Sequence, residues 1–179
     1  PRSETDFICG LGMQTYLVEG SIHFTTNQVG RVTTMQWKPE SAPALAGVPV
    51  KEQEEEVSFT NGDTTLSGTL VLPVTKGPHP AVVLVHGSTS NLRSQSRTMA
   101  DFFALNGVAA LIYDKRGSGN STGDWRKSGF DDLADDALAG LELLKNRTDI
   151  NPHQIGLWGA SQGGWIVGLG SEEHKAELQ

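Results

Sequence analysis

The chain has 179 residues, of which 37% are hydrophobic and 20% are charged, and it carries a formal net charge of −7. These values are ordinary for a globular protein, and the length suits one domain with a small addition. The negative charge and the lack of a basic cluster argue against a nucleic-acid partner. No apolar run approaches the roughly 20 residues that a membrane-spanning helix needs.

Cysteine content and the first residue leave the cellular compartment open. Cys9 is the only cysteine, so no disulfide can form within the chain. The sequence starts at Pro1 and shows neither an initiator methionine nor a signal peptide. We therefore expect either a cytoplasmic protein or one that is secreted after processing.

Residues 1–50 are expected to form a small β appendage. Two β-prone segments, residues 16–24 and 31–37, flank a run of turn residues, which predicts an antiparallel hairpin. One hairpin is only marginally stable by itself and has to pack on something. His23 and Trp37 are interpreted as sheet residues, because no metal-ligand spacing accompanies the histidine.

A linker is expected after this appendage. Residues 41–49 are rich in proline and alanine, and residues 51–56 form an acidic run that is expected to be solvated. We place the domain boundary there, with one domain at residues 1–50 and the other at residues 51–179. Residues 57–72 then have the pattern of a hairpin around an Asn-Gly turn.

Beyond this hairpin, predicted strands alternate with predicted helices. Residues 81–86, 108–113 and 154–159 form mainly apolar runs, as in parallel strands that are buried on both faces. A helix predicted over residues 93–106 connects the first two, and a helix that starts near Phe130 connects the last two. The acidic residues of the second helix are interpreted as a solvated face: Asp131, Asp135, Asp136 and Glu142. This alternation predicts an α/β fold with a mostly parallel sheet.

Two polar motifs follow the first two predicted parallel strands. His86-Gly87-Ser88 comes after the first strand, and the Gly-rich loop 114–123 comes after the second. Functional residues of such sheets lie at the carboxyl ends of the strands. A nucleotide site is disfavoured at the Gly-rich loop, because the next helix starts about ten residues later and no Gly-Lys-Ser/Thr is present.

The third motif is Gly-x-Ser-x-Gly at residues 159–163, between a predicted strand and a predicted helix. This context is typical of a nucleophile elbow, a sharp turn that holds a serine in a strained conformation at the top of a sheet. Ser161 is therefore the candidate nucleophile. Gly159 and Gly163 are expected to be required, because a Cβ at either position would collide with neighbouring backbone.

With these three motifs the chain resembles the α/β-hydrolase family, and within it the bacterial esterases and the catalytic domains of prolyl-oligopeptidase-type peptidases. The motifs that carry the resemblance are His86-Gly87, Asp114-x-Arg116-Gly117-x-Gly119-x-Ser121 and residues 155–164. The resemblance covers about residues 56–170. It implies a three-layer α/β-hydrolase-type sheet, of which the chain holds the N-terminal half, with a small N-terminal β appendage.

The resemblance also implies roles for individual residues. Ser161 would form an acyl-enzyme from an ester, thioester or amide. The backbone N–H groups of Gln162 and Ser88 would form the oxyanion hole, and one such donor typically contributes about 3 kcal/mol to transition-state stabilisation. His86 and Gly87 would shape the loop that carries the second donor, and His86 is not expected to act as the general base.

The rest of the catalytic triad is not expected in this chain. Hydrolases of this fold place an Asp or Glu and then a His on later loops, but the chain continues for only 18 residues after Ser161. The downstream candidates are Glu172, Glu173, His174 and Glu177. At about 1.5 Å per helical residue, His174 would lie about 18 Å from the elbow and point away from it.

The missing part of the fold would leave the outer edge of the nucleophile strand bare, which favours pairing with another chain. Three interpretations stay open: a fragment of a longer hydrolase, a short form that pairs with a second chain, and a weak or inactive relative. We expect a serine hydrolase of small esters that needs no metal or organic cofactor. Its activity is expected to be low or dependent on a partner, because the triad Asp and His are not in the chain. The alternatives are a peptidase or thioesterase of the same fold, and a non-catalytic module that forms a homodimer through the bare edge.

Overall fold

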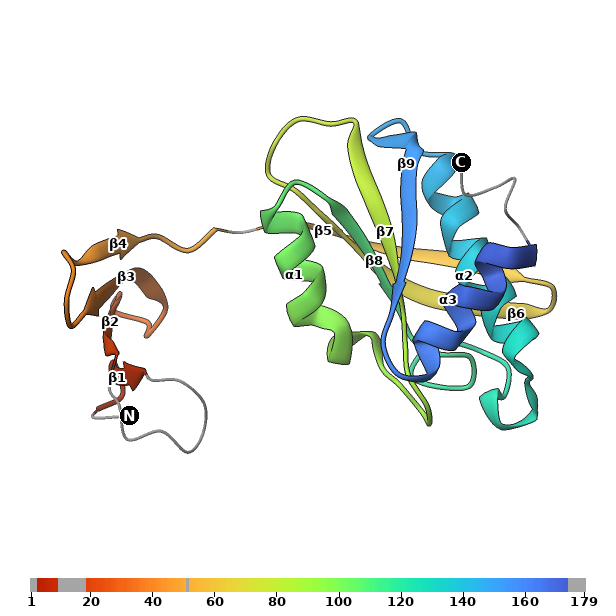
Figure 1. Cartoon of the computed structure of the whole chain (residues 1–179), viewed down its shortest axis with the longest axis horizontal. Helices are drawn as coiled ribbons and strands as arrows, with labels where there is room; N and C mark the ends of the chain where they lie inside the picture. Colours follow the sequence, from red (N-terminus) through yellow and green to blue (C-terminus); the bar gives the residue numbers. More distant parts are fainter. Residues whose placement is uncertain (1–2, 10–18, 51, 174–179) are drawn as a thin grey trace. The chain divides into compact units, whose positions relative to one another are not determined.

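A computed structural model describes residues 3–9, 19–50 and 52–173 of the chain (Figure 1). The chain divides into two compact units, residues 1–51 and 52–179. The sequence places the boundary one residue earlier.

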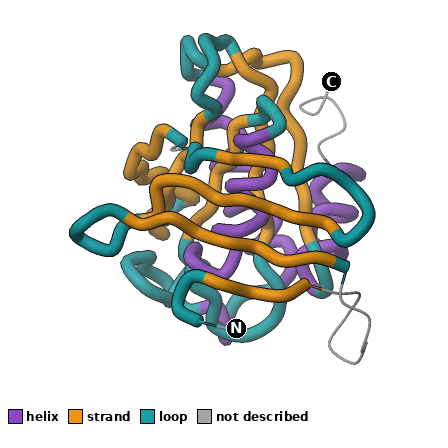
Figure 2. The backbone as a smooth tube through the Cα atoms, turned by 90° about the vertical axis from the view of Figure 1, so that its left-hand side faces the viewer, coloured by secondary structure: helices purple, strands orange, loops and turns teal. Residues whose placement is uncertain are grey.

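The smaller unit is a four-stranded antiparallel sheet rather than a single hairpin. Its strands lie side by side in chain order (Figure 2). They are β1 (Asp6–Cys9), β2 (Gly20–Thr26), β3 (Val32–Pro39) and β4 (Leu45–Gly47). The predicted hairpin corresponds to β2 and β3, although residues 16–18 of its first strand lie outside the described residues. His23 and Trp37 are sheet residues as predicted, and the His23 Nδ1 lies within hydrogen-bond distance, 2.7 Å, of the Asp6 carboxylate.

The predicted linker contains one of these strands. β4 lies within the Pro/Ala-rich stretch and pairs with β3 from Trp37↔Leu45 to Met35↔Gly47. A segment of three residues is too short to show the alternating pattern of a strand. Its hydrogen-bond partner, β3, can be identified only in the folded sheet.

The larger unit is built on a five-stranded mixed sheet in the order β5-β6-β8-β7-β9. The strands are β5 (Gln53–Asn61), β6 (Thr64–Leu72), β7 (His79–Val85), β8 (Ala109–Tyr113) and β9 (Ile150–Gly159). β6 is antiparallel to both of its neighbours, whereas β7 is parallel to β8 and to β9. All strands except β6 therefore run in the same direction, and the predicted mostly parallel sheet is confirmed.

Helices cover both faces of this sheet (Figure 1). A 3₁₀ turn, η1 (Arg93–Ser96), leads into α1 (Arg97–Leu105) on one face. The other face carries α2 (Phe130–Lys145) and α3 (Gln162–Glu173), with a short η2 (Trp125–Lys127) before α2. The three-layer α/β architecture expected from the sequence is thus present.

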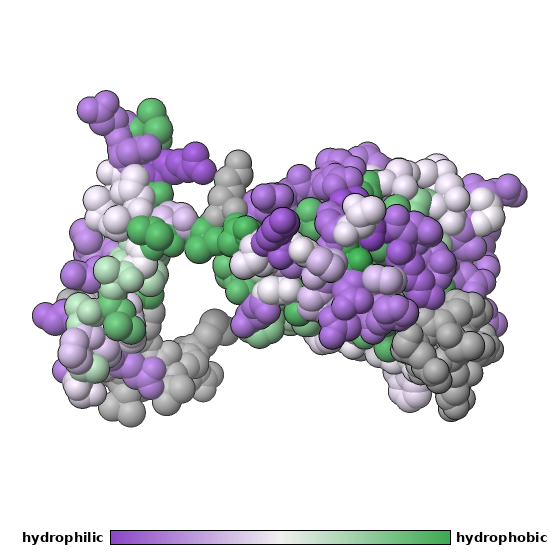
Figure 3. Space-filling model, turned by 90° about the horizontal axis from the view of Figure 1, so that it is seen from above, coloured by the Kyte–Doolittle hydropathy of each residue, from purple (hydrophilic) through white to green (hydrophobic). Residues whose placement is uncertain are grey.

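The side chains of β7 show how the two faces are filled. Val82 and Leu84 pack with residues of α1, whereas Val83 and Val85 pack with residues of α2. This alternation follows from the two-residue period of a strand, and it explains why the whole run is apolar. The face of the larger unit that Figure 3 shows is mainly hydrophilic, since the apolar sides of the helices are turned to the sheet.

The predicted acidic run is part of the sheet. Gln53–Glu56 belong to β5, an edge strand, rather than to a linker, and they are exposed as expected. Edge strands tolerate charged side chains, and here arginines from three other segments neutralise them. The ion pairs, each 2.8 Å long, are Glu54–Arg97, Glu55–Arg147 and Glu56–Arg93. Sequence composition alone could not show these partners.

The strand that leads to Ser161 is also an edge. Within residues 52–173, β9 pairs with β7 and with no other strand. It begins four residues earlier than predicted, because Ile150 pairs with His79 before a register irregularity. The bare outer edge expected from the sequence is present in the part of the chain that the structure describes.

Replacement of a central leucine tests this architecture. Leu111 on β8 is fully buried between the two helical layers, so Leu111→Ala is expected to lower the free energy of unfolding by about 2–5 kcal/mol. Leu105→Ala is the control, since Leu105 is 57% exposed, and it should cost less than about 1 kcal/mol. Urea unfolding followed by circular dichroism measures both values. Equal losses in the two variants would contradict the assigned core.

Candidate active site

Ser161 lies on a two-residue turn, Ala160-Ser161, between β9 and α3. Its φ angle is +56°, a left-handed conformation that a residue with a side chain seldom adopts. The turn is closed by hydrogen bonds from Gly163 N–H to the Ala160 carbonyl and from Gly164 N–H to the Ser161 carbonyl, both 3.0 Å long. Ser161 is exposed, and no described residue forms a hydrogen bond with its hydroxyl. The hydroxyl is thus free to meet a substrate.

The glycines on either side of Ser161 are required for this turn, as the sequence predicts. A Cβ at Gly159 would overlap the Gly163 carbonyl, and a Cβ at Gly163 would overlap the Val85 carbonyl. The elbow therefore packs directly against the carboxyl end of β7. The loop that follows β7 is equally close, since a Cβ built on Gly87 would lie 3.8 Å from the Ser161 Cβ.

The two expected oxyanion donors are both available. Ser88 is exposed on the loop after β7, and Gln162 is the first residue of α3. No described residue accepts a hydrogen bond from either backbone N–H. Thr89, next to Ser88, has a φ angle of +69°, so this loop holds a second strained residue. Gln162 directly follows Ser161, and the loop that carries Ser88 approaches Ser161 at Gly87. The roles of the two N–H groups remain predictions.

The Gly-rich loop after β8 holds the Ser88 loop in place. The Lys115 N–H donates to the Asn91 carbonyl over 3.0 Å, and the Asn91 side-chain amide donates to the Ser88 carbonyl over 2.7 Å. The hydroxyls of Ser90 and Ser118 are 3.0 Å apart. The strained conformation at Thr89 is therefore fixed by contacts from a neighbouring strand end.

Asp114 fixes the Gly-rich loop itself. Its carboxylate accepts hydrogen bonds from the backbone N–H of Arg93 at 2.9 Å and of Asn120 at 3.1 Å. The Ser121 hydroxyl donates to the Asp114 carbonyl over 2.6 Å and accepts from the Ser67 N–H over 3.0 Å. These motif residues bind backbone groups, so their contribution to the site is to hold the loops.

Arg116 and Asp136 form a buried ion pair that the sequence analysis missed. Arg116 donates to both carboxylate oxygens of Asp136, over 2.7 Å from Nε and 2.6 Å from a terminal nitrogen. Asp136 is fully buried, so its placement on a solvated face was wrong. Leu133, Asp136 and Ala137 have the i, i+3, i+4 spacing of one helix face, and this spacing was the available signal.

His86 directly follows β7 and begins the loop that carries Ser88. Its side chain is buried, and neither ring nitrogen has a hydrogen-bond partner among the described residues. Burial, together with the positive charge of Lys115, lowers the pKa of His86 to about 3. The ring packs on Tyr113, with 4.7 Å between ring centroids. The imidazole is therefore neutral near pH 7 and has no bond to Ser161, and its role in shaping the loop remains a prediction.

The downstream triad candidates cannot be placed. His174 and Glu177 lie outside the described residues, and the side chains of Glu172 and Glu173 are not described. Within the described ranges, no group of three or more His, Cys, Asp or Glu residues could hold a metal ion. No helix among these ranges is long and apolar enough to cross a membrane.

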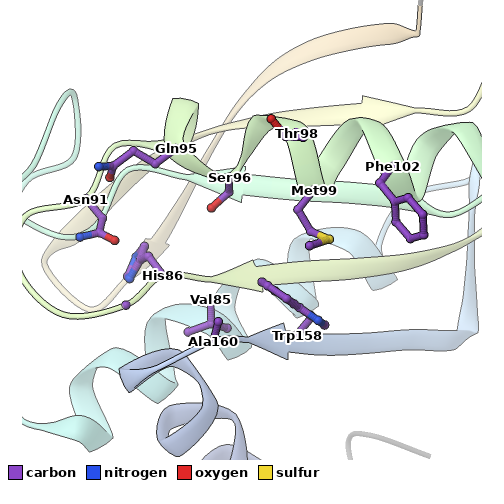
Figure 4. A pocket seen from close by; sticks show the side chains of 11 residues that line it. Val85, His86, Asn91, Gln95, Ser96, Thr98, Met99, Phe102, Trp158 and Ala160 are labelled. Atoms are coloured by element: carbon purple, nitrogen blue, oxygen red, sulfur yellow. The ribbon is translucent and has the colours of Figure 1, made fainter. Parts of the chain in front are cut away.

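A cavity of about 580 Å³ opens beside the elbow, between α1 and the ends of β7 and β9 (Figure 4). Met99 and Phe102 extend from α1 toward Trp158 on β9, and His86 lies at the other end near Asn91. The remaining lining residues are Val85, Gly87, Gln95, Ser96, Thr98 and Ala160. Because Gly87 and Ala160 flank the elbow, the cavity begins next to the candidate nucleophile. No lining residue is acidic.

Comparison with known proteins identifies the family. Residues 76–179 match the model of the Hydrolase_4 family, the serine aminopeptidases S33. The chain belongs to this family of α/β hydrolases. The structure agrees, since the Pyrococcus furiosus esterase Pf2001 matches with a TM-score of 0.60 and 29% identity, over 71% of this chain and 48% of the esterase.

Two curated proteins show the same relationship in sequence. The quorum-quenching protein AidA of Acinetobacter baumannii is 29% identical over 113 residues, which cover 63% of this chain and 37% of AidA. The thiohydrolase aneE of Aspergillus aculeatus is 32% identical over 120 residues, covering 64% of this chain and 37% of aneE. The chain spans less than half the length of each of these relatives.

The Arg116–Asp136 pair is expected to be a major contributor to stability. Arg116→Met leaves the Asp136 carboxylate buried without its cation, and should lower the free energy of unfolding by about 3–5 kcal/mol. Arg126→Met removes an exposed pair with Asp124 and should cost less than about 1 kcal/mol. Both are measured by urea unfolding. A loss in Arg116→Met as small as that in the control would refute this role.

His86 is expected to make stability depend on pH. Its pKa rises from about 3 in the folded protein to about 6.5 on unfolding, so the unfolded chain binds the extra proton between these values. The free energy of unfolding should therefore decrease by about 2 kcal/mol from pH 7 to pH 5. His86→Gln should lack this part of the decrease. Parallel pH profiles of the wild-type protein and His86→Gln would contradict the prediction.

Proposed function

We propose that this chain carries the nucleophile and the oxyanion hole of a serine hydrolase that cleaves small carboxylic esters through an acyl-enzyme on Ser161. The observation that carries the proposal is the conformation of Ser161. A serine at positive φ, exposed on a strand-to-helix turn and followed by a residue with an unpartnered N–H group, matches the requirements of a nucleophile elbow.

In this proposal the Ser161 Oγ attacks the ester carbonyl, and its proton passes to a general base. The carbonyl oxygen becomes an oxyanion that accepts hydrogen bonds from the N–H groups of Gln162 and Ser88. Collapse of this intermediate expels the alcohol and leaves an acyl group on Ser161, which water then hydrolyses. The proposal requires a base from outside the described residues, because none of them forms a hydrogen bond with the Ser161 hydroxyl and His86 is neutral.

The cavity supports an ester substrate with a small apolar group. Met99, Phe102 and Trp158 give it an apolar wall, and its volume of about 580 Å³ suits a small molecule. Recognition of a free peptide amine would require a negative group, and no lining residue supplies one. A thioester substrate is the second candidate, favoured by the similarity to the thiohydrolase aneE.

The edge strand β9 supports a different alternative, a non-catalytic module that forms a homodimer. The outer edge of β9 has unpaired backbone groups within residues 52–173, and such edges pair readily with a second chain. This alternative predicts a stable dimer in which Ser161 does not react. Labelling of the serine therefore separates the two proposals.

Ser161→Ala is expected to abolish both labelling by a fluorophosphonate and hydrolysis of a short-chain nitrophenyl ester. Loss of the serine nucleophile removes the acyl-enzyme route, so turnover above the background hydrolysis of the ester should be lost. Ser58→Ala replaces an exposed serine on β5 and should retain full turnover and labelling. Turnover that persists in Ser161→Ala would overturn the proposal.

A further inference from the structure

Lys115 is a buried cation without a carboxylate partner. The residue is only 1% exposed, and no acidic side chain forms an ion pair with it among the described residues. Burial lowers the pKa of its ammonium group. Burying an ammonium group away from a counter-ion is costly unless strong acceptors surround it. Its position therefore requires an explanation other than stability alone.

Two acceptors surround the Lys115 ammonium group, and they come from the two halves of the candidate oxyanion hole. Nζ donates to the Gly87 carbonyl over 2.9 Å and to the side-chain Oε1 of Gln162 over 2.8 Å. Gly87 belongs to the loop after β7, and Gln162 is the residue after the candidate nucleophile. A single side chain from a third strand end thus connects both loops.

The bond to Gly87 acts directly on a candidate donor. The Gly87 carbonyl and the Ser88 N–H belong to the same peptide group, which is planar, so fixing the oxygen also fixes the direction of the N–H. Because the two groups point in opposite directions, the N–H is directed away from Lys115. A cationic donor on the oxygen also polarises the peptide and strengthens its N–H as a donor.

Other contacts hold Lys115 itself in place. Its ammonium group lies 5.5 Å from the centre of the Trp125 ring, within the range of a cation–π interaction. Its backbone N–H donates to Asn91, whose side chain binds the Ser88 carbonyl. The Ser88 peptide and the one that follows it are therefore both fixed through Lys115 and its partner.

We propose that Lys115 is a positioning residue of the oxyanion hole, which ties the Ser88 peptide to Gln162 and orients the two donors before substrate binds. The catalytic purpose of this orientation rests on the proposed function. The physical tie between the two loops stands separately, so it can be measured without turnover.

The first measurement is amide hydrogen exchange by mass spectrometry, with urea unfolding as the check on global stability. Lys115→Met should raise exchange about tenfold in peptides that cover residues 86–92 and 160–165, and leave the β5–β6 hairpin unchanged. Lys127→Met is the matched control, because Lys127 is an exposed lysine on η2, and it should change neither segment. Unchanged exchange in both segments of Lys115→Met would overturn the proposal.

The second measurement is steady-state hydrolysis of a short-chain nitrophenyl ester. Lys115→Met should lower kcat by at least about tenfold and change KM by less than about threefold, because the donors act on the transition state. Lys115→Arg keeps the charge and the donors, and should retain more of kcat than Lys115→Met. An increase in KM alone, or equal losses in the Met and Arg variants, would contradict a positioning role.

These outcomes separate the two proposals. If the wild-type protein shows no turnover, or turnover that does not depend on Ser161, the proposed function is overturned. Hydrogen exchange then still decides whether Lys115 connects the two loops. If Lys115→Met does not fold, Lys115→Gln is the second variant. It is uncharged and shorter, and the same criteria for exchange and kcat apply to it.

Discussion

The larger unit depends on a steric constraint at the junction of β9 and α3. The carbonyl oxygens of Gly163 and Val85 occupy the space that side chains at residues 159 and 163 would need. With glycine at both positions, the chain passes from β9 to α3 through only Ala160 and Ser161, and Ser161 takes a positive φ angle. The same close approach brings the elbow against the end of β7, so the loops that form the candidate site begin at neighbouring strands.

Three consecutive charged residues at the end of β8 maintain this arrangement. Asp114, Lys115 and Arg116 are all more than nine-tenths buried, and each binds a different part of the unit. Asp114 accepts a hydrogen bond from the start of η1, Lys115 donates to both site loops, and Arg116 pairs with α2. Buried charges require specific partners, and this requirement makes the loop a junction between elements that the chain keeps far apart in sequence.

The parts of the fold that could be predicted are those with a strong local pattern. Three elements could be identified in this way: β7 and β8 from their uninterrupted apolar runs, and α2 from its apolar side. Burial on both faces of a strand gives a continuous apolar run, and burial of one helix face gives apolar residues at helical spacing. The predictions for the acidic residues of β5 and for the short β4 were wrong for the opposite reason. Their strand pairing and their arginine partners come from distant segments, so composition suggested a linker.

At the candidate site, the sequence by itself determined the elbow, since Gly-x-Ser-x-Gly at the end of an apolar strand admits few other conformations. It also indicated that the three loops lie together, because parallel strands present their carboxyl ends at one edge of the sheet. Only the tertiary structure decided that Asp136 is buried, that His86 is neutral and enclosed, and that Lys115 connects Gly87 to Gln162. Each of these depends on contacts between residues 20 or more positions apart, and such contacts follow from packing rather than from local pattern.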